Sequence, residues 1–147
     1  MNDVFLYPLQ NSKEYKDIIN CIKNTKGSLL VNGLLPVQKP HISYSIFNDL
    51  SRQMIFITSS DLEAKKVYED LSFYMEDKVE YLGFQDIYFY HLDAKDRNEE
   101  AKKLKVLLKL ANKEKIILVT SIEAVLRKYI PKQVLLDSVS HYKVEIG

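Results

Sequence analysis

The chain has 147 residues, enough for one domain with a buried core, and its 46% hydrophobic and 11% aromatic content argues against a disordered chain. The 21 Lys and Arg residues nearly balance the 20 Asp and Glu residues, so the net charge does not call for nucleic acid or an anionic membrane as a partner. The single cysteine, Cys21, cannot form an internal disulfide, and no apolar run approaches the ~18 residues of a membrane span. We expect a single soluble, cytoplasmic domain over residues 1–147.

Helical and strand patterns alternate in the first part of the chain. Residues 13–24 carry apolar side chains at helical spacing, and the short apolar run between glycines in 25–33 predicts a strand. Residues 41–50 return to helical spacing. The continuous apolar run in 53–60 predicts a strand buried on both faces of a parallel sheet.

The central segment begins with a helix that Ser60 or Asp61 can cap and that is predicted to end near Glu76. A short strand at 79–83 and an irregular aromatic connection at 84–96 follow. The residues predicted to form the apolar side of the helix are Leu62, Val67, Leu71 and Tyr74.

The last third of the chain completes the alternation. The pattern predicts a long helix at 96–112 and the clearest strand of the chain at 115–121. It then predicts a short helix at 121–131, ended by Pro131, and one or two extended pieces at 134–147. The long helix is expected to pack through Ala101, Leu104, Leu107, Leu108 and Ala111. This alternation predicts an α/β fold with three layers, α/β/α, around a mostly parallel sheet.

The stretch GLLPVQKPH, residues 33–41, lies between a predicted strand and a predicted helix, where a phosphate-binding loop would lie. Gly33 and Lys39 fit the G-x-x-x-x-G-K-[ST] spacing. However, Gln38 replaces the second glycine, and Pro40 replaces the residue whose hydroxyl would bind magnesium. We therefore expect a vestigial loop without a bound nucleotide, and we assign no catalytic residue, cofactor site or metal site.

Two other patterns offer alternatives from different classes. Lysines at 102, 105, 109 and 113 recur at three- and four-residue spacing and could contact a DNA backbone, although a solvated helix face explains them more simply. Lys39 could instead serve a nucleotide-binding enzyme domain. The three histidines lie far apart, and none forms a metal-ligand pattern with Cys21.

Four segments in order carry a resemblance to a known family. They are GLLPVQKPH, MIFITSSDLEAKKVYEDLSFYMEDKVEYLG, the loop D-x-x-x-Y at 86–90, and EKIILVTSIEAVLRKYIP. Together they resemble the N-terminal region of the bacterial transcription-repair coupling factors, the Mfd family, over residues 10–147. This region is similar to the first domain of the damage-binding protein UvrB, which implies a helicase-like, P-loop-NTPase-like fold with a degenerate phosphate loop. The chain has Phe89 where many relatives have proline before the loop tyrosine.

The resemblance implies a non-catalytic fragment of a much longer protein. The parent would be an ATP- and magnesium-dependent DNA translocase that displaces stalled RNA polymerase and recruits UvrA. Its motor and its UvrA-contacting surface would both lie beyond residue 147. We expect the isolated fragment to lack UvrA binding and to self-associate weakly through an uncovered sheet edge.

Overall fold

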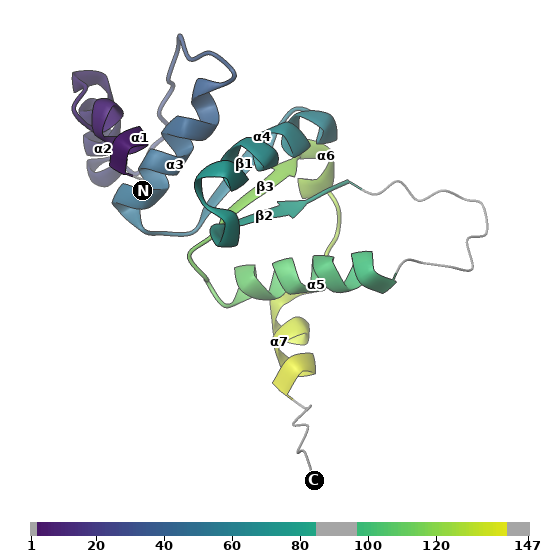
Figure 1. Cartoon of the computed structure of the whole chain (residues 1–147). Coiled ribbons are helices and arrows are strands. Elements are labelled where there is room, and N and C mark those ends of the chain that lie inside the picture. Colours follow the sequence, from purple (N-terminus) through teal and green to yellow (C-terminus); the bar gives the residue numbers. More distant parts are fainter. Residues whose placement is uncertain (1–2, 85–96, 141–147) are drawn as a thin grey trace.

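The computed structural model describes residues 3–84 and 97–140. Its centre is a sheet of three parallel strands in the order β1-β3-β2, formed by β1 (Met54–Thr58), β2 (Val79–Leu82) and β3 (Ile117–Ser121) (Figure 1). In the register of the sheet, Leu118 of β3 lies opposite Ile55 on one side and Glu80 on the other. The predicted parallel sheet and the α/β class are confirmed.

Side-chain alternation along the central strand divides the core between the two faces of the sheet. Ile117 and Val119 pack on one face with α4 (Asp61–Tyr74). Leu118 packs on the other face with Leu82 and with Val106 of α5 (Arg97–Ala111). The two helices therefore cover opposite faces, as Figure 1 shows, and the sheet lies between two helical layers.

Three N-terminal helices, α1 (Asp3–Gln10), α2 (Lys13–Asn24) and α3 (Gln38–Leu50), precede the sheet, and α3 packs on α4. The Asp49 carboxylate joins all three. It accepts hydrogen bonds from Gln10 Nε2 at 2.8 Å and from the Tyr15 hydroxyl at 2.6 Å. Burial and this acidic partner raise the pKa of Tyr15, so the hydroxyl remains a hydrogen-bond donor.

The helix at 13–24 and the strands at 53–60, 79–83 and 115–121 are confirmed, with ends that differ by at most two residues from the prediction. Ser60 is the N-cap of α4, since its hydroxyl accepts a hydrogen bond from the Glu63 amide. The helix ends at Tyr74, and a short 3-10 turn, Glu76–Lys78, leads into β2. The predicted helix at 41–50 begins three residues earlier, at Gln38.

The predicted strand at 25–33 is wrong. No strand is assigned there, and the apolar side chains of Leu29, Leu30 and Val31 are exposed, Leu30 by 81%. A strand requires a partner for its backbone N–H and C=O groups, and this segment pairs with none of the three strands described. Strand-like composition alone did not determine the structure of this segment.

The predicted extended pieces at 134–147 are wrong over residues 134–140, which belong to helix α7 (Lys132–Ser140). The Leu135 amide donates to the Pro131 carbonyl, so Pro131 precedes a helix as well as ending the previous segment. That segment is shorter than predicted, because α6 covers only Ile122–Val125. Residues 141–147 and the aromatic connection at 85–96 lie outside the described residues.

Several predicted core positions are exposed. Leu62 of α4 is 68% exposed, and Ala101 and Leu104 of α5 are also exposed, whereas Val106 of α5 is buried. β1 is not buried on both faces, since Ile55 and Ile57 are 56% and 49% exposed. The α5 side of the core contains residues of β2 and β3 and none of β1, which leaves that face of β1 uncovered.

Ser72 of α4 has a buried hydroxyl with no hydrogen-bond partner among the described residues. Because an unpaired buried donor costs free energy and alanine favours helix more than serine does, we expect Ser72→Ala to raise the free energy of unfolding by about 0.5–1 kcal/mol. Urea denaturation monitored by circular dichroism measures the change. A loss of stability would mean that the hydroxyl has a partner in solution.

Candidate functional site

The vestigial phosphate loop leads into the first turn of α3. The Gln38 amide donates to the Leu35 carbonyl at 3.0 Å, and the Lys39 amide donates to the Pro36 carbonyl at 3.3 Å. The Gln38 side chain turns back and accepts a hydrogen bond from the Leu35 amide at 2.9 Å. Pro40 is buried and has no N–H.

These bonds occupy the groups that a phosphate would need. A phosphate-binding loop presents several free backbone amides at a helix N-terminus. Here the amides of Leu35, Gln38 and Lys39 already have acceptors within the turn. Gly33 lies five residues before the helix and has a φ of +85°. This left-handed backbone conformation, rather than close approach to an anion, explains why a glycine occupies the position.

The Lys39 charge is exposed and lies near a carboxylate of α4. Hydrogen bonds from the hydroxyl and the amide of Ser59 lower the pKa of Glu63, and the positive charge of Lys39 lowers it further. An anionic ligand of Lys39 would therefore meet a neighbouring negative charge. The predicted loop residues Gln38, Lys39 and Pro40 are thus together, in a turn that lacks the electrostatics of a phosphate site.

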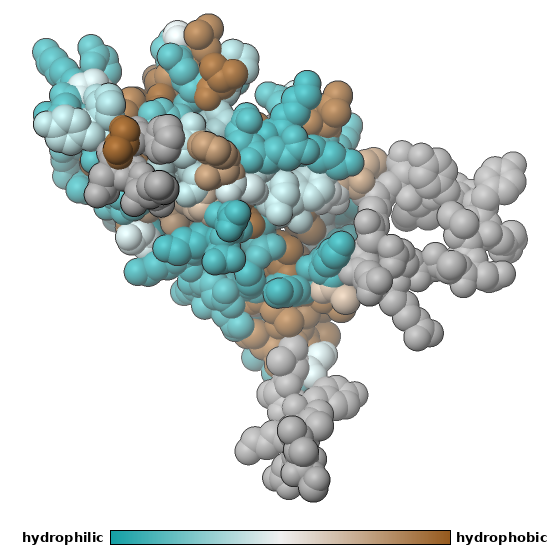
Figure 2. All heavy atoms as spheres, in the orientation of Figure 1, coloured by the Kyte–Doolittle hydropathy of each residue, from teal (hydrophilic) through white to brown (hydrophobic). Residues whose placement is uncertain are grey.

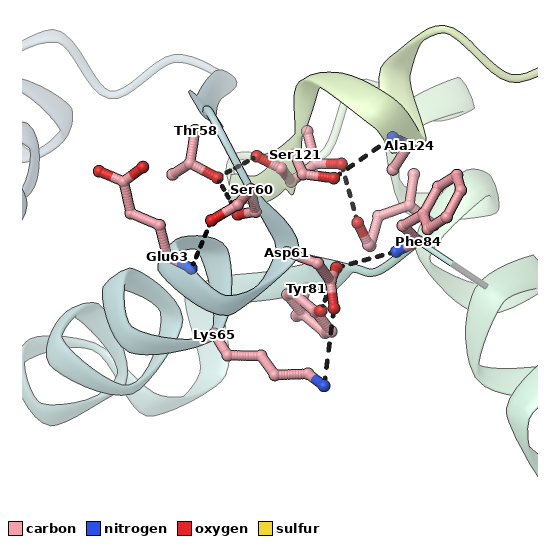
Figure 3. A network of polar contacts seen from close by, with 11 residues as sticks. Thr58, Ser60, Asp61, Glu63, Lys65, Tyr81, Phe84, Ser121 and Ala124 are labelled. Atoms are coloured by element: carbon pink, nitrogen blue, oxygen red, sulfur yellow. Dashed lines mark hydrogen bonds and ion pairs between the residues drawn. The ribbon is translucent and has the colours of Figure 1, made fainter. Parts of the chain in front are cut away.

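A second polar cluster lies at the carboxyl ends of the strands, where open α/β sheets bind ligands. Figure 3 shows it around Thr58, Asp61 and Ser121. The Thr58 hydroxyl donates to the Ser60 carbonyl at 2.8 Å, and the Thr120 hydroxyl donates to the Leu82 carbonyl at 2.8 Å. Ser121 is fully buried and accepts from the Ala124 amide as the N-cap of α6.

Asp61, in the first turn of α4, joins that helix to the end of β2. It accepts hydrogen bonds from the Tyr81 hydroxyl at 2.6 Å and from the Phe84 amide at 2.9 Å, and Lys65 lies 3.6 Å away. Partial burial acts to raise the pKa of Asp61, but the two hydrogen bonds and Lys65 outweigh it and hold that pKa below its ordinary value. The sequence identified Asp61 only as a possible helix cap.

Gly83 lets the Tyr81 side chain reach Asp61. A Cβ at position 83 would lie 2.7 Å from the Tyr81 hydroxyl oxygen and 2.9 Å from the nearby ring carbon Cζ. The small residue after β2 therefore leaves room for the ring. Spacing alone could not reveal this contact, because it depends on the path of the Tyr81 side chain.

The hydroxyls and the carboxylate of this cluster are engaged in helix caps and in bonds between strand ends. Asp61 remains ionised and is surrounded by donors, which makes it a weak general base. Among residues 3–84 and 97–140, no group of three His, Cys, Asp or Glu side chains could hold a metal ion. We interpret the cluster as structural, because its hydrogen bonds fix α4 and α6 to the sheet.

The four lysines of the predicted stripe have different environments in the structure. Lys109 pairs with Glu80 of β2, and this hydrogen bond raises the pKa of Lys109. Lys113 follows the end of α5, with φ of 57°. Lys102 and Lys105 are exposed. The stripe therefore offers fewer unpaired cations along one helix face than its spacing predicts.

Comparisons with known proteins gave no match to a family model, to a curated protein or to a solved structure. In the part of the chain that the structure describes, no helix has the length and apolar character needed to cross a bilayer.

Proposed function

We propose that this chain is a non-catalytic structural module of the kind found at the N-terminus of bacterial transcription-repair coupling factors. The order of the segments that carry the resemblance supports this proposal. MIFIT forms β1, DLEAKKVYEDLSFY forms α4, VEYL forms β2 and ILVTS forms β3, all in one parallel sheet. The helicase-like ancestry of the fold is part of the proposal.

The closed first turn of α3 is the observation that carries the non-catalytic part. Three amides of the vestigial loop donate within the turn, and Pro40 supplies none. In this proposal ATP, magnesium, RNA polymerase and DNA belong to the motor and polymerase-binding parts of the parent protein. UvrA would contact a separate domain of the parent protein. The module supports these parts through its fold.

Calorimetric titration with ATP and magnesium tests this function against a nucleotide-binding domain that uses Lys39. We expect no saturable binding at Gly33–Pro40 in the millimolar range, since the donors there are occupied. The comparison uses Lys39→Ala, with Lys66→Ala as a matched exposed lysine on α4. A dissociation constant below ~0.1 mM, roughly 5 kcal/mol of binding free energy, that is lost only in Lys39→Ala would overturn the proposal.

A further inference from the structure

A surface pocket of about 560 Å³ lies between the C-terminal end of α2, the chain that follows it and the turn after α3. Its charged lining residues are Lys23, Lys26 and Arg52, and no Asp or Glu lines it. Each cation comes from a different one of these three segments. Figure 2 shows a mainly hydrophilic surface over α2.

These cations are available to a ligand. All three are exposed, and none has an ion pair or a hydrogen-bonded side-chain partner among the described residues. This contrasts with Lys109, which pairs with Glu80, and with Lys39, which lies near Glu63. Three like charges around one concavity repel one another unless an anion or salt neutralises them.

The backbone of the pocket also has donors to offer. The amides of Lys26, Gly27 and Leu29 donate to no described acceptor, whereas the Thr25 amide closes α2 on the Cys21 carbonyl. A Cβ at position 27 would meet only the Thr25 methyl group, at 3.6 Å, so the space beside Gly27 is open. Cations and free amides together are the groups that bind phosphate oxygens.

We propose that this pocket binds a phosphate-bearing anion, such as the polyphosphate of a nucleotide or the phosphodiesters of a nucleic acid. A carboxylate-rich peptide fits less well, because peptide interfaces bury an apolar core and the lining has few apolar side chains. The pocket is separate from the vestigial loop. The proposal therefore does not depend on the function proposed above.

Two probes test it on the whole chain at low salt. The first is inorganic triphosphate, followed by calorimetry, and the second is a labelled single-stranded oligonucleotide, followed by fluorescence anisotropy. The test variant is Lys23→Glu/Lys26→Glu/Arg52→Glu. The matched control, Lys13→Glu/Lys16→Glu/Lys66→Glu, makes the same change of net charge at exposed lysines elsewhere.

We expect at least one probe to bind and its affinity to fall tenfold or more in the test variant only. If the oligonucleotide is the ligand, its affinity should fall with salt at a logarithmic slope of about −2 for three neutralised phosphates. Triphosphate binding without oligonucleotide binding would assign the pocket to nucleotides or free phosphate. Failure of both probes, or an equal loss in the control variant, would overturn the proposal.

The same experiment distinguishes anion binding at the pocket from a role of its cations in helix stability. Lys23 and Arg52 lie at the C-terminal ends of α2 and α3, where exposed carbonyls favour cations. If these residues had only that structural role, the test variant would melt at a lower temperature than the wild type, and the wild type would bind neither probe. Binding that survives Lys39→Ala and is lost in the test variant would support the pocket. This result would not affect the proposal that the vestigial loop binds no nucleotide.

Discussion

Truncation of Leu71 to alanine is expected to lower the free energy of unfolding by about 2–5 kcal/mol. Leu71 is fully buried in α4 and belongs to the cluster that joins α3 and α4 to the sheet through Tyr44, Val79 and Ile117. Its removal would leave a cavity at the centre of this cluster. For a domain of ordinary stability, about 5–15 kcal/mol, this is a large share of the total.

Leu62→Ala is the matched control, because it makes the same change on the same helix at a side chain that is 68% exposed. We expect it to change the stability by less than about 0.5 kcal/mol. Urea denaturation of both variants gives the comparison. Equal effects of the two substitutions would mean that α4 packs against the sheet through a different face.

Replacement of Asp61 should have the second largest effect. Asp61→Ala would leave the Tyr81 hydroxyl and the Phe84 amide without their acceptor, at a cost of about 1–3 kcal/mol. Asp61→Asn keeps an acceptor but loses the charge, so we expect a smaller cost. Asp70→Asn, an exposed carboxylate on the same helix, serves as the control.

The Asp61 contribution should depend on pH. The pKa of Asp61 is lower in the folded protein than its ordinary value, so folding favours the ionised form. The stabilisation is fully present above the unfolded pKa of about 4 and is lost as the pH falls through the lower, folded pKa. The stability difference between wild type and Asp61→Asn should therefore be largest above about pH 5 and narrow in acid. A stability difference that does not change with pH would contradict this structural role of the ionised Asp61.

The elements around the sheet were predictable because several signals agree there. Strand β3 begins with the apolar residues Ile117, Leu118 and Val119 and is buried at every position. Ser60 precedes a helix in which the Glu63 side chain reaches back to Ser59. Local chemistry and tertiary burial thus favour the same structure.

The errors arose where local pattern and tertiary context disagree. The apolar run around Leu30 has strand composition but no paired strand. Residues 132–140 form a helix, and Pro131 before it is a residue type that can either end one helix or begin the next. Helix α1 was not predicted at all, and it contains Pro8, which normally disfavours a helix interior.

The candidate sites were predictable to different degrees. The loss of phosphate-binding groups at Gln38 and Pro40 follows from residue types alone. The occupied amides of the loop and the Tyr81–Asp61 bond depend on backbone geometry and side-chain paths that spacing does not specify. Lys23 and Lys26 are neighbours in the sequence, but only folding brings Arg52, from the turn after α3, to the same pocket.

The most direct test of the closed phosphate loop is an NMR titration of the ¹⁵N-labelled chain with ATP and magnesium, followed at the amides of Leu35, Gln38 and Lys39. Because these amides already donate within the first turn of α3, we predict that their resonances stay unshifted through the millimolar range, whatever occurs near Arg52. Saturable shifts at these three amides, with a dissociation constant below ~0.1 mM, would show a working phosphate loop and contradict the proposed non-catalytic function.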